Sequence, residues 1–97
     1  MVKYKLLWTP SVSSFSTTQN VKGTISSSFV TFGGPLPISA SQLEYAFADN
    51  APVVWYVETI SNTGRISNSV SSSFIASNEA FPAPATGLTQ QFVSYIP

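Results

Sequence analysis

A chain of 97 residues and 10.4 kDa is long enough for one domain and too short for two. Hydrophobic residues make up 43% of it, which provides enough apolar side chain for a core and argues against a wholly disordered chain. Only 8% of the residues are charged, against about 25% in an ordinary soluble domain, and the formal net charge is zero. The polarity of the chain comes instead from 17 Ser and 9 Thr residues.

Histidine and cysteine are both absent from the sequence. The chain therefore lacks the usual zinc, copper and haem ligands, the bases of Ser–His–Asp and Cys–His catalysis, and any disulfide. Its four carboxylates, Glu44, Asp49, Glu58 and Glu79, show no spacing that indicates a catalytic pair in one cleft. We therefore expect a protein that is not an enzyme, with no cofactor, no catalytic residue and no metal ion.

Two classes of partner are excluded by the same composition. The longest apolar run, residues 51–57, is far below the roughly 20 residues that a transmembrane helix needs. The cations are Lys3, Lys5, Lys22 and Arg65, which are too few and too scattered for the positive groove that binds nucleic acid. We expect neither a membrane nor a nucleic acid as a partner.

Residues 2–8 alternate between apolar and polar side chains, the pattern of a β-strand with one buried face. The predicted buried face consists of Val2, Tyr4, Leu6 and Trp8. Lys3 and Lys5 point the opposite way, where we expect them to protect a sheet edge from mispairing. Pro10 ends the strand, because proline cannot donate a ladder hydrogen bond.

The segment of residues 11–20 is rich in serine and threonine and predicts an edge strand or a loop. Apolar residues resume at Val21, Ile25 and Phe29, which indicates a further strand. Residues 32–37 contain two glycines and two prolines, a composition typical of a turn. We expect the strand to stop there.

Residues 41–48 fit two local structures. Ser41 and Glu44 match a capping box, in which each side chain bonds a backbone amide, and this predicts one short helical turn. Every second residue from Leu43 to Phe47 is also apolar, as in a strand. Both interpretations stay open, since so short a segment cannot hold a helix unaided.

The clearest pattern is a β-hairpin. Residues 52–60 are rich in β-branched and aromatic side chains, and both faces of the strand are apolar, which favours a central place in a sheet. Turn residues follow from Ser61 to Gly64, and apolar residues continue at Ile66, Val70 and Phe74.

The end of the chain has a different composition. Residues 81–87 contain two prolines and are typical of an extended, polyproline-like linker, which leads to a short strand expected over residues 90–96. We therefore divide the chain into a β-sandwich domain of residues 1–80 and, over residues 81–97, a Pro-rich linker with a terminal strand or assembly arm. The sequence leaves open whether the terminal strands pair within the chain or with a neighbour.

Six or seven short strands with frequent turn signals predict an all-β fold, a small antiparallel β-sandwich. Residues 57–67, Val-Glu-Thr-Ile-Ser-Asn-Thr-Gly-Arg-Ile-Ser, resemble the late hairpin of fibronectin type III domains. Trp8-Thr9-Pro10 resembles the early Trp-x-Pro of that family, and residues 84–88 resemble the spacer that begins a following module. A generic immunoglobulin-like sandwich, or a strand-swapped variant completed by a neighbour, describes the pattern equally well.

The resemblance implies binding or scaffolding rather than catalysis. A hydroxyl-rich, nearly uncharged surface suits a protein that is mostly covered by neighbours, since net charge near zero favours association. As a short Ser/Thr-rich β-module with a Pro-rich tail, this chain resembles the decoration, cement or fibre modules of bacteriophage virions. We expect a structural or interaction module in a virion or other extracellular assembly. Its partners are copies of itself or other subunits, in a homo-oligomer or array.

Aromatic side chains raise an alternative, a carbohydrate-binding module whose exposed rings stack on sugars, although alternating aromatic residues also fill cores. Tyr45 and Tyr56 are the exposed candidates, because each lies opposite the predicted interior in at least one register. Arg65, at the hairpin tip, is a candidate contact for an acidic partner, although a lone exposed arginine is usually only solvated. The candidate interaction residues are Tyr45, Tyr56, Arg65, Phe81, Phe92 and Tyr95.

Overall fold

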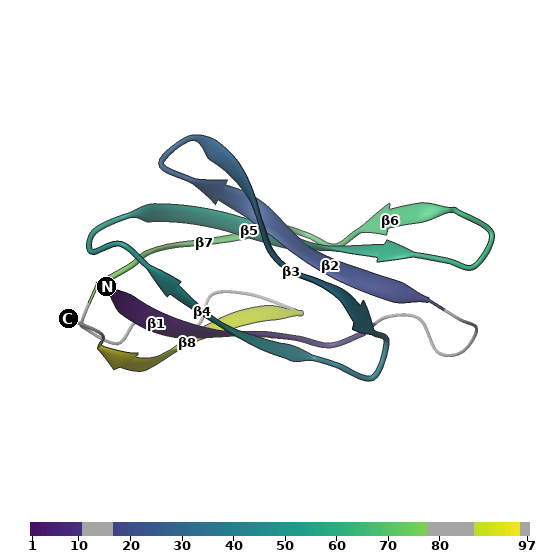
Figure 1. The fold of residues 1–97 in the computed structure, drawn as a ribbon, viewed down its shortest axis with the longest axis horizontal. Helices are drawn as coiled ribbons and strands as arrows, with labels where there is room; N and C mark the ends of the chain where they lie inside the picture. The colour runs from purple at the N-terminus through teal and green to yellow at the C-terminus, as the bar shows by residue number, and fades with distance from the viewer. Residues whose placement is uncertain (11–16, 78–86, 96–97) are drawn as a thin grey trace.

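The computed structural model of the chain describes residues 1–10, 17–77 and 87–95. They form eight β-strands in two packed layers (Figure 1). The strands are β1 (Val2–Trp8), β2 (Thr18–Ile25), β3 (Ser28–Pro37), β4 (Gln42–Phe47), β5 (Pro52–Ile60), β6 (Ile66–Asn68), β7 (Ser72–Ile75) and β8 (Leu88–Tyr95). Every pairing between them is antiparallel. The small antiparallel β-sandwich expected from the sequence is confirmed.

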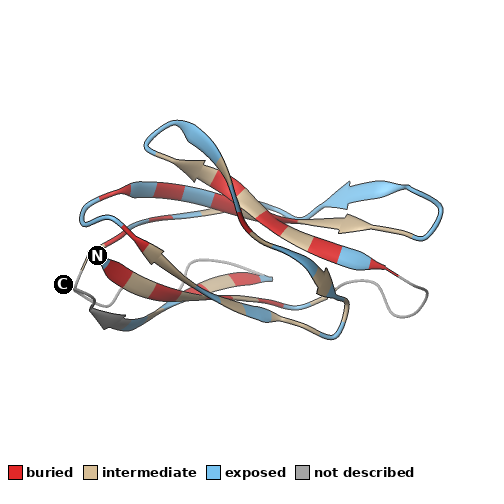
Figure 2. Ribbon diagram, in the orientation of Figure 1, coloured by how far each residue is buried: buried red, intermediate tan, exposed pale blue. Residues whose placement is uncertain are grey.

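One sheet has three strands in the order β4-β1-β8. The other has the order β3-β2-β5-β6, and β7 pairs with β5 beyond the end of β6. Strands β1, β2 and β5 are therefore central, and buried residues alternate with more exposed ones along all three (Figure 2). The inner faces of the two sheets meet in one hydrophobic core.

The first strand has the buried face that the sequence predicts. The buried side chains of β1 are Val2, Tyr4, Leu6 and Trp8. Lys3 and Lys5 lie on the opposite face, but they do not protect an edge, because β4 and β8 flank β1 on both sides. Lys3 instead forms an ion pair with Glu44 of β4, with 2.9 Å between Nζ and Oε2.

A two-residue turn at Ser26 and Ser27 divides the strand that the sequence predicts through Val21, Ile25 and Phe29. Both serines have positive φ angles, 51° and 71°, as the favoured two-residue hairpin turns require. Phe29 therefore lies in β3 and is 62% exposed. Asn-Gly or Asp-Gly usually announces such a turn, and a pair of serines carries no comparable signal.

The prediction of a turn over residues 32–37 is wrong, because these residues continue β3. Since β3 is an edge strand, prolines that lack a ladder donor are tolerated in it. The register between β2 and β3 shifts on both sides of Val21. Gly34, at a φ of 144°, packs against Asn20 so closely that no side chain fits there. The run of glycine and proline is thus an irregular part of an edge strand.

The helical turn considered near residues 41–48 is not formed, and the strand interpretation is right. β4 pairs with β1 along its whole length, and the Ser41 carbonyl accepts a hydrogen bond from the Trp8 N–H at 3.0 Å. The edge of β1 supplies ladder partners for this segment, whereas a single helical turn has too few hydrogen bonds to persist alone. Pairing as a strand also buries Phe47 in the core.

The predicted hairpin is confirmed as β5 and β6, and β5 is central as expected. Two hydrogen bonds close its turn. The Ser61 N–H donates to the Arg65 carbonyl at 2.9 Å, and the Gly64 N–H donates to the Ser61 carbonyl at 3.0 Å. Gly64 has a φ of 85°, which suits glycine. After β6 the hydroxyl of Ser69 accepts the Val57 N–H at 2.9 Å, and the ladder resumes in β7.

The last strand, β8, pairs with β1 of the same chain. It begins two residues earlier than the sequence predicts. The sandwich therefore includes residues on both sides of the proposed division at residue 80. Apart from Gly87, the predicted Pro-rich linker lies outside the described residues.

Two buried tryptophans connect the sheets through hydrogen bonds to buried glutamines. Trp8 of the three-stranded sheet donates its Nε1–H to Oε1 of Gln19 in β2, at 2.9 Å. Trp55 of the five-stranded sheet donates its Nε1–H to Oε1 of Gln90 in β8, at 3.1 Å. The two indoles meet edge to face, with 6.5 Å between ring centroids. Since an unpaired buried N–H costs about 1–3 kcal/mol, these bonds fix how the sheets face each other.

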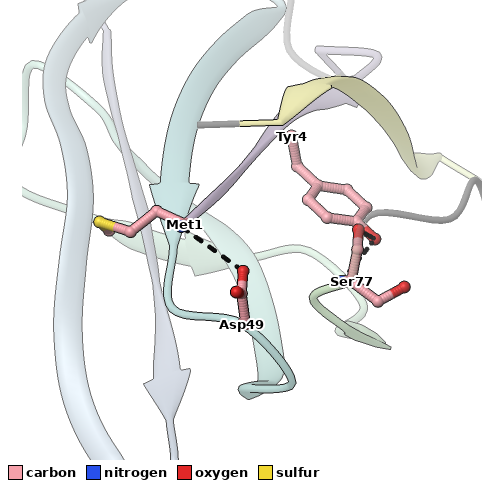
Figure 3. Close-up of polar contacts among 4 residues, drawn as sticks. All are labelled: Met1, Tyr4, Asp49 and Ser77. Carbon is pink, nitrogen blue, oxygen red and sulfur yellow. Dashed lines mark hydrogen bonds and ion pairs between the residues drawn. The ribbon is translucent and has the colours of Figure 1, made fainter. Parts of the chain in front are cut away.

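Tyr4 makes a further connection near the start of β1 (Figure 3). Its hydroxyl lies 3.4 Å from the Ile75 carbonyl oxygen and 3.3 Å from that of Ser77, and it accepts the Ser77 N–H at 3.3 Å. The amino group of Met1 pairs with Asp49 at 3.5 Å. These contacts hold the end of β7 and the turn after β4 near the start of β1.

We expect Gln90→Ala to lower the free energy of unfolding by about 2–3 kcal/mol, because the buried Trp55 N–H loses its acceptor. Gln91→Ala, at the exposed next position of the same strand, is the matched control and should change that free energy by less than about 0.5 kcal/mol. Urea unfolding followed by tryptophan fluorescence measures both variants. Equal losses would show that the indole–amide bond does not stabilise the fold.

Candidate interaction surface

The side of β3, β2, β5 and β7 that points away from the core is here called the outer face. Its main residues are Lys22, Thr24, Phe29, Val54, Tyr56 and Ile75. Thr24 pairs with Phe29 on one side and with Val54 on the other, so one row crosses three strands. Phe29 is 62%, Val54 42% and Ile75 54% exposed. Three large apolar side chains are therefore open to solvent on one sheet face.

The alternation of β5 explains why apolar side chains lie outside. Val53, Trp55 and Val57 point inward and are buried, so Val54 and Tyr56 must point outward. The sequence shows that both faces of this strand are apolar, and the structure covers only one of them with a second sheet.

Two opposite charges on the outer face, those of Lys22 and Glu58, neutralise each other. Lys22 Nζ lies 3.1 Å from Oε1 and 3.2 Å from Oε2 of Glu58, and Asn20 donates to Oε1 at 3.2 Å. The hydrogen bond from Asn20, followed by that from Lys22, holds the pKa of Glu58 below its ordinary value. Lys22 Nζ also lies 5.8 Å from the centre of the Phe29 ring. The cation nearest the exposed phenylalanine is thus already paired.

The structure separates the two predicted tyrosines. Tyr56 is half-buried on the outer face, in register with Lys22. Tyr45 lies in the other sheet, in β4, and its ring packs against Phe32 and Phe47 with centroid distances of 5.0 and 4.9 Å. Tyr45 is therefore part of the core margin and not the exposed platform that the sequence predicts.

The other predicted residues lie at separate places. Arg65 is exposed in the turn between β5 and β6. Phe92 of β8 is half-buried, and its ring meets that of Tyr4 edge to face at 5.7 Å. Tyr95 pairs with Val2 at the end of β8, and Phe81 lies outside the described residues. These candidates do not form one site with Tyr56.

A second feature is an open cavity of about 200 Å³ at the end of the sandwich beside β6. Trp8, Val57 and Leu88 supply apolar lining, and Thr59, Ser67 and Asn68 supply hydroxyl and amide groups. The buried amide of Gln19 also lines it and donates to Thr59 Oγ1 at 3.5 Å. No ionisable side chain is among its described lining, so the cavity suits a neutral polar group.

Metal-ligating side chains do not gather in the described parts of the chain. Over residues 1–10, 17–77 and 87–95, no three His, Cys, Asp or Glu side chains gather where they could hold a metal ion. The same residues contain no helix with the length and hydropathy needed to cross a membrane. The outer face and the end cavity are thus the two candidate sites.

Sequence reasoning missed the exposed phenylalanine and the cavity amide. Phe29 follows the apolar alternation of Val21 and Ile25, and only the turn at Ser26 moves it outside. Gln19 lies in a polar stretch that predicts an edge strand or a loop, and nothing in that stretch indicates that its amide will be buried against Trp8.

Comparisons with protein families, with curated proteins and with solved structures find no match to this chain. Its own residues are therefore the basis for the function proposed below.

We expect the Glu58→Gln variant to be less stable than the wild-type chain at pH 7. We expect this difference in stability to disappear in acid. The lowered pKa of Glu58 means that its charged form stabilises the fold above about pH 4.3, the ordinary value for glutamate, and that this contribution disappears as the pH falls through the lower folded value. Urea unfolding between pH 7 and pH 3 measures the difference from the wild-type chain.

Glu44→Gln is the matched control, because the pKa of Glu44 is also lowered, through its hydrogen bond with Lys3. The side chain of Glu44 is 43% exposed, against 14% for Glu58, so solvent screens its ion pair more strongly. We expect Glu44→Gln to lower the free energy of unfolding at pH 7 as well, but by less than Glu58→Gln does. A gap between wild-type and E58Q stability that stays constant with pH would contradict the assigned interaction.

Proposed function

We propose that this chain is a non-catalytic structural and interaction module that acts through protein–protein contacts. It is a fibronectin type III-like or immunoglobulin-like module, in an assembly of the kind formed by virion decoration, cement or fibre proteins. Its partners are further copies of itself or other subunits of that assembly, in a virion or another extracellular structure. The two-layer antiparallel sandwich and the hairpin over residues 57–67 support the choice of module class.

The outer face is the observation that carries the proposal. Single exposed apolar residues are normal on protein surfaces, but a group on one sheet face marks a contact site. Phe29, Val54 and Ile75 form such a group, with the half-buried ring of Tyr56 beside them. A sheet face with an exposed aromatic side chain fits the apolar part of a protein–protein interface.

The charge balance also supports an assembly role. A net charge of zero leaves no long-range repulsion between copies of the chain. The pairing of Lys22 with Glu58 keeps the centre of the outer face neutral. Burial of this face against a neighbour would therefore desolvate few unpaired charges.

We expect the chain to self-associate with rising concentration, and Phe29→Ser to weaken that association at least about tenfold. The basis is that truncation of an aromatic anchor in an interface commonly costs more than about 1.4 kcal/mol, which corresponds to tenfold in affinity. Light scattering across a concentration series measures the mass of both proteins.

Ile66→Ser is the control for a general loss of exposed apolar surface. The exposed fraction of Ile66, 59%, is similar to the 62% of Phe29. Ile66 lies in β6 at the hairpin, however, and not in the row through Val54. We expect little change in association for this variant. A wild-type chain that stays monomeric at millimolar concentration, or equal effects of the two variants, would contradict the proposed interface.

The end cavity supports a second candidate function, binding of a glycan. Its apolar lining at Trp8 beside the hydroxyl and amide groups of Thr59 and Asn68 resembles the mixed surface that sugars need. The described lining has no ionisable side chain, which favours a neutral sugar over a charged one. We therefore propose the cavity, in place of the predicted Tyr45 and Tyr56, as the site for the glycan alternative.

If the cavity binds sugar, Asn68→Ala should weaken binding about tenfold through loss of one polar partner. Asn62→Ala, in the exposed turn of the same hairpin, is the control and should leave binding unchanged. Tryptophan fluorescence during titration with glucose, galactose and N-acetylglucosamine measures the effect, because Trp8 lines the cavity. No response to any of the three sugars in the wild-type chain would remove this candidate.

A further inference from the structure

The amide of Gln19 is buried but only partly hydrogen-bonded. The residue is 2% exposed, and its Oε1 accepts the Trp8 N–H at 2.9 Å. Its Nε2 carries two hydrogens. Among residues 1–10, 17–77 and 87–95 the one acceptor near Nε2 is Thr59 Oγ1 at 3.5 Å, longer than the usual N–H···O distance of about 2.7–3.2 Å. Within the described residues, at least one N–H of Gln19 therefore has no acceptor.

The other core glutamine is more fully hydrogen-bonded. Gln90 accepts from Trp55 and Ser72, at 3.1 and 3.0 Å, and its Nε2 donates to the Ser73 carbonyl at 3.3 Å. Buried polar groups are nearly always paired with protein, water or a ligand. Gln19 lines the end cavity, whereas Gln90 is not part of its described lining. A group that enters the cavity can thus supply the acceptor that Gln19 lacks.

The polar lining of the cavity is graded in depth. Ser67 and Asn68 are exposed, Thr59 is half-buried, and Gln19 is buried. Hydroxyl and amide groups therefore lie at the rim, and the donor of Gln19 lies at the inner end. A ligand reaches this donor with an acceptor atom that projects from the body of the ligand. A carbonyl oxygen on a side group projects in this way, whereas a hydroxyl oxygen bonded directly to a sugar ring stays close to the ring.

Apolar surface lies beside the same donor. The amide of Gln19 bonds the indole of Trp8, so the two groups are adjacent in the cavity wall. Val57 and Leu88 are buried in the lining, and Val70, which is 65% exposed, adds an apolar part of the rim. A methyl group attached to the carbonyl carbon would contact this surface. The described lining also contains no ionisable side chain, which favours an uncharged group.

We propose that the end cavity binds the acetamido group of a neutral N-acetylated sugar. The carbonyl oxygen of that group accepts an N–H of Gln19, and its methyl group packs on the indole of Trp8. This rests on the glycan alternative proposed above and names the class of sugar. The cavity volume of about 200 Å³ exceeds the roughly 150 Å³ of a protein cavity that holds benzene. It therefore admits an acetamido group together with part of the sugar ring, whose hydroxyls face Ser67 and Asn68.

Sugars that differ only in the substituent at C2 test the proposal on the natural chain. N-acetylglucosamine is compared with glucose, and N-acetylgalactosamine with galactose, in titrations followed by tryptophan fluorescence. We expect the acetylated sugar of each pair to bind at least about tenfold more tightly, because only it supplies the projecting acceptor and the methyl group. Equal affinities within the pairs would overturn the inference, because the N–H of Gln19 is then served equally well by water.

Saturation-transfer NMR on the natural chain with N-acetylglucosamine locates the bound group. We expect the acetyl methyl protons to receive more saturation than any ring proton, because the methyl group is the part in contact with Trp8. Stronger saturation of the ring protons would overturn the proposed orientation.

Gln19→Glu tests the donor itself. Glutamate keeps an oxygen that accepts the Trp8 N–H and lacks the Nε2 hydrogens. We expect the preference for N-acetylglucosamine over glucose to fall about tenfold in this variant. Asn68→Ala is the matched variant at the rim of the same cavity, and it should weaken both sugars alike and keep their ratio. A folded Gln19→Glu protein that keeps the wild-type ratio would overturn the inference. The sugar pairs and the NMR measurement need no substitution, so they decide the proposal if Gln19→Glu does not fold.

Failure of this inference is distinguishable from failure of the functions proposed above. If each pair of sugars binds with equal affinity, the acetamido site is refuted and the glycan alternative stands. If none of the four sugars binds, both are refuted. Association through the outer face is measured by light scattering without sugar, so neither result affects it.

Discussion

The two indole–amide hydrogen bonds between the sheets are the interaction on which the rest of the structure depends. They run in opposite directions, from Trp8 to Gln19 and from Trp55 to Gln90, so each sheet supplies one donor and one acceptor. A buried indole N–H needs an acceptor, and in both cases a glutamine of the opposite sheet provides it. The bonds therefore determine which side of each sheet faces inward, and they make the last strand a part of the core.

The inward orientation of Trp55 in β5 has a consequence for the opposite face of its sheet. With Trp55 turned toward Gln90, the alternate residues Val54 and Tyr56 must face solvent. The tight turn at Ser26 and Ser27 brings Phe29 to the same face from β3. An apolar outer face is thus produced by the same geometry that forms the core, and it leaves a surface suited to contact with another protein.

The candidate site was only partly predictable from the sequence. The exposed tip at Arg65 and the outward position of Tyr56 follow from a recognisable hairpin and from strand alternation. Phe29 was not predictable, because its side depends on a turn with no sequence signal. Tyr45 was predicted to be exposed, but its ring fills space beside Phe32 and Phe47, a neighbourhood that only the packing of two sheets creates.

The sequence by itself determined the fold class, the buried face of β1, the central hairpin and the absence of histidine and thiol chemistry. These follow from local alternation, turn residues and composition, which do not depend on distant parts of the chain. The tertiary structure decided that residues 42–47 form a strand and that β8 completes the sheet beside β1. It also decided that Gln19 and Gln90 are buried. Each of these depends on which strands become neighbours, and a pairing between residues far apart in the chain leaves no local pattern in either of them.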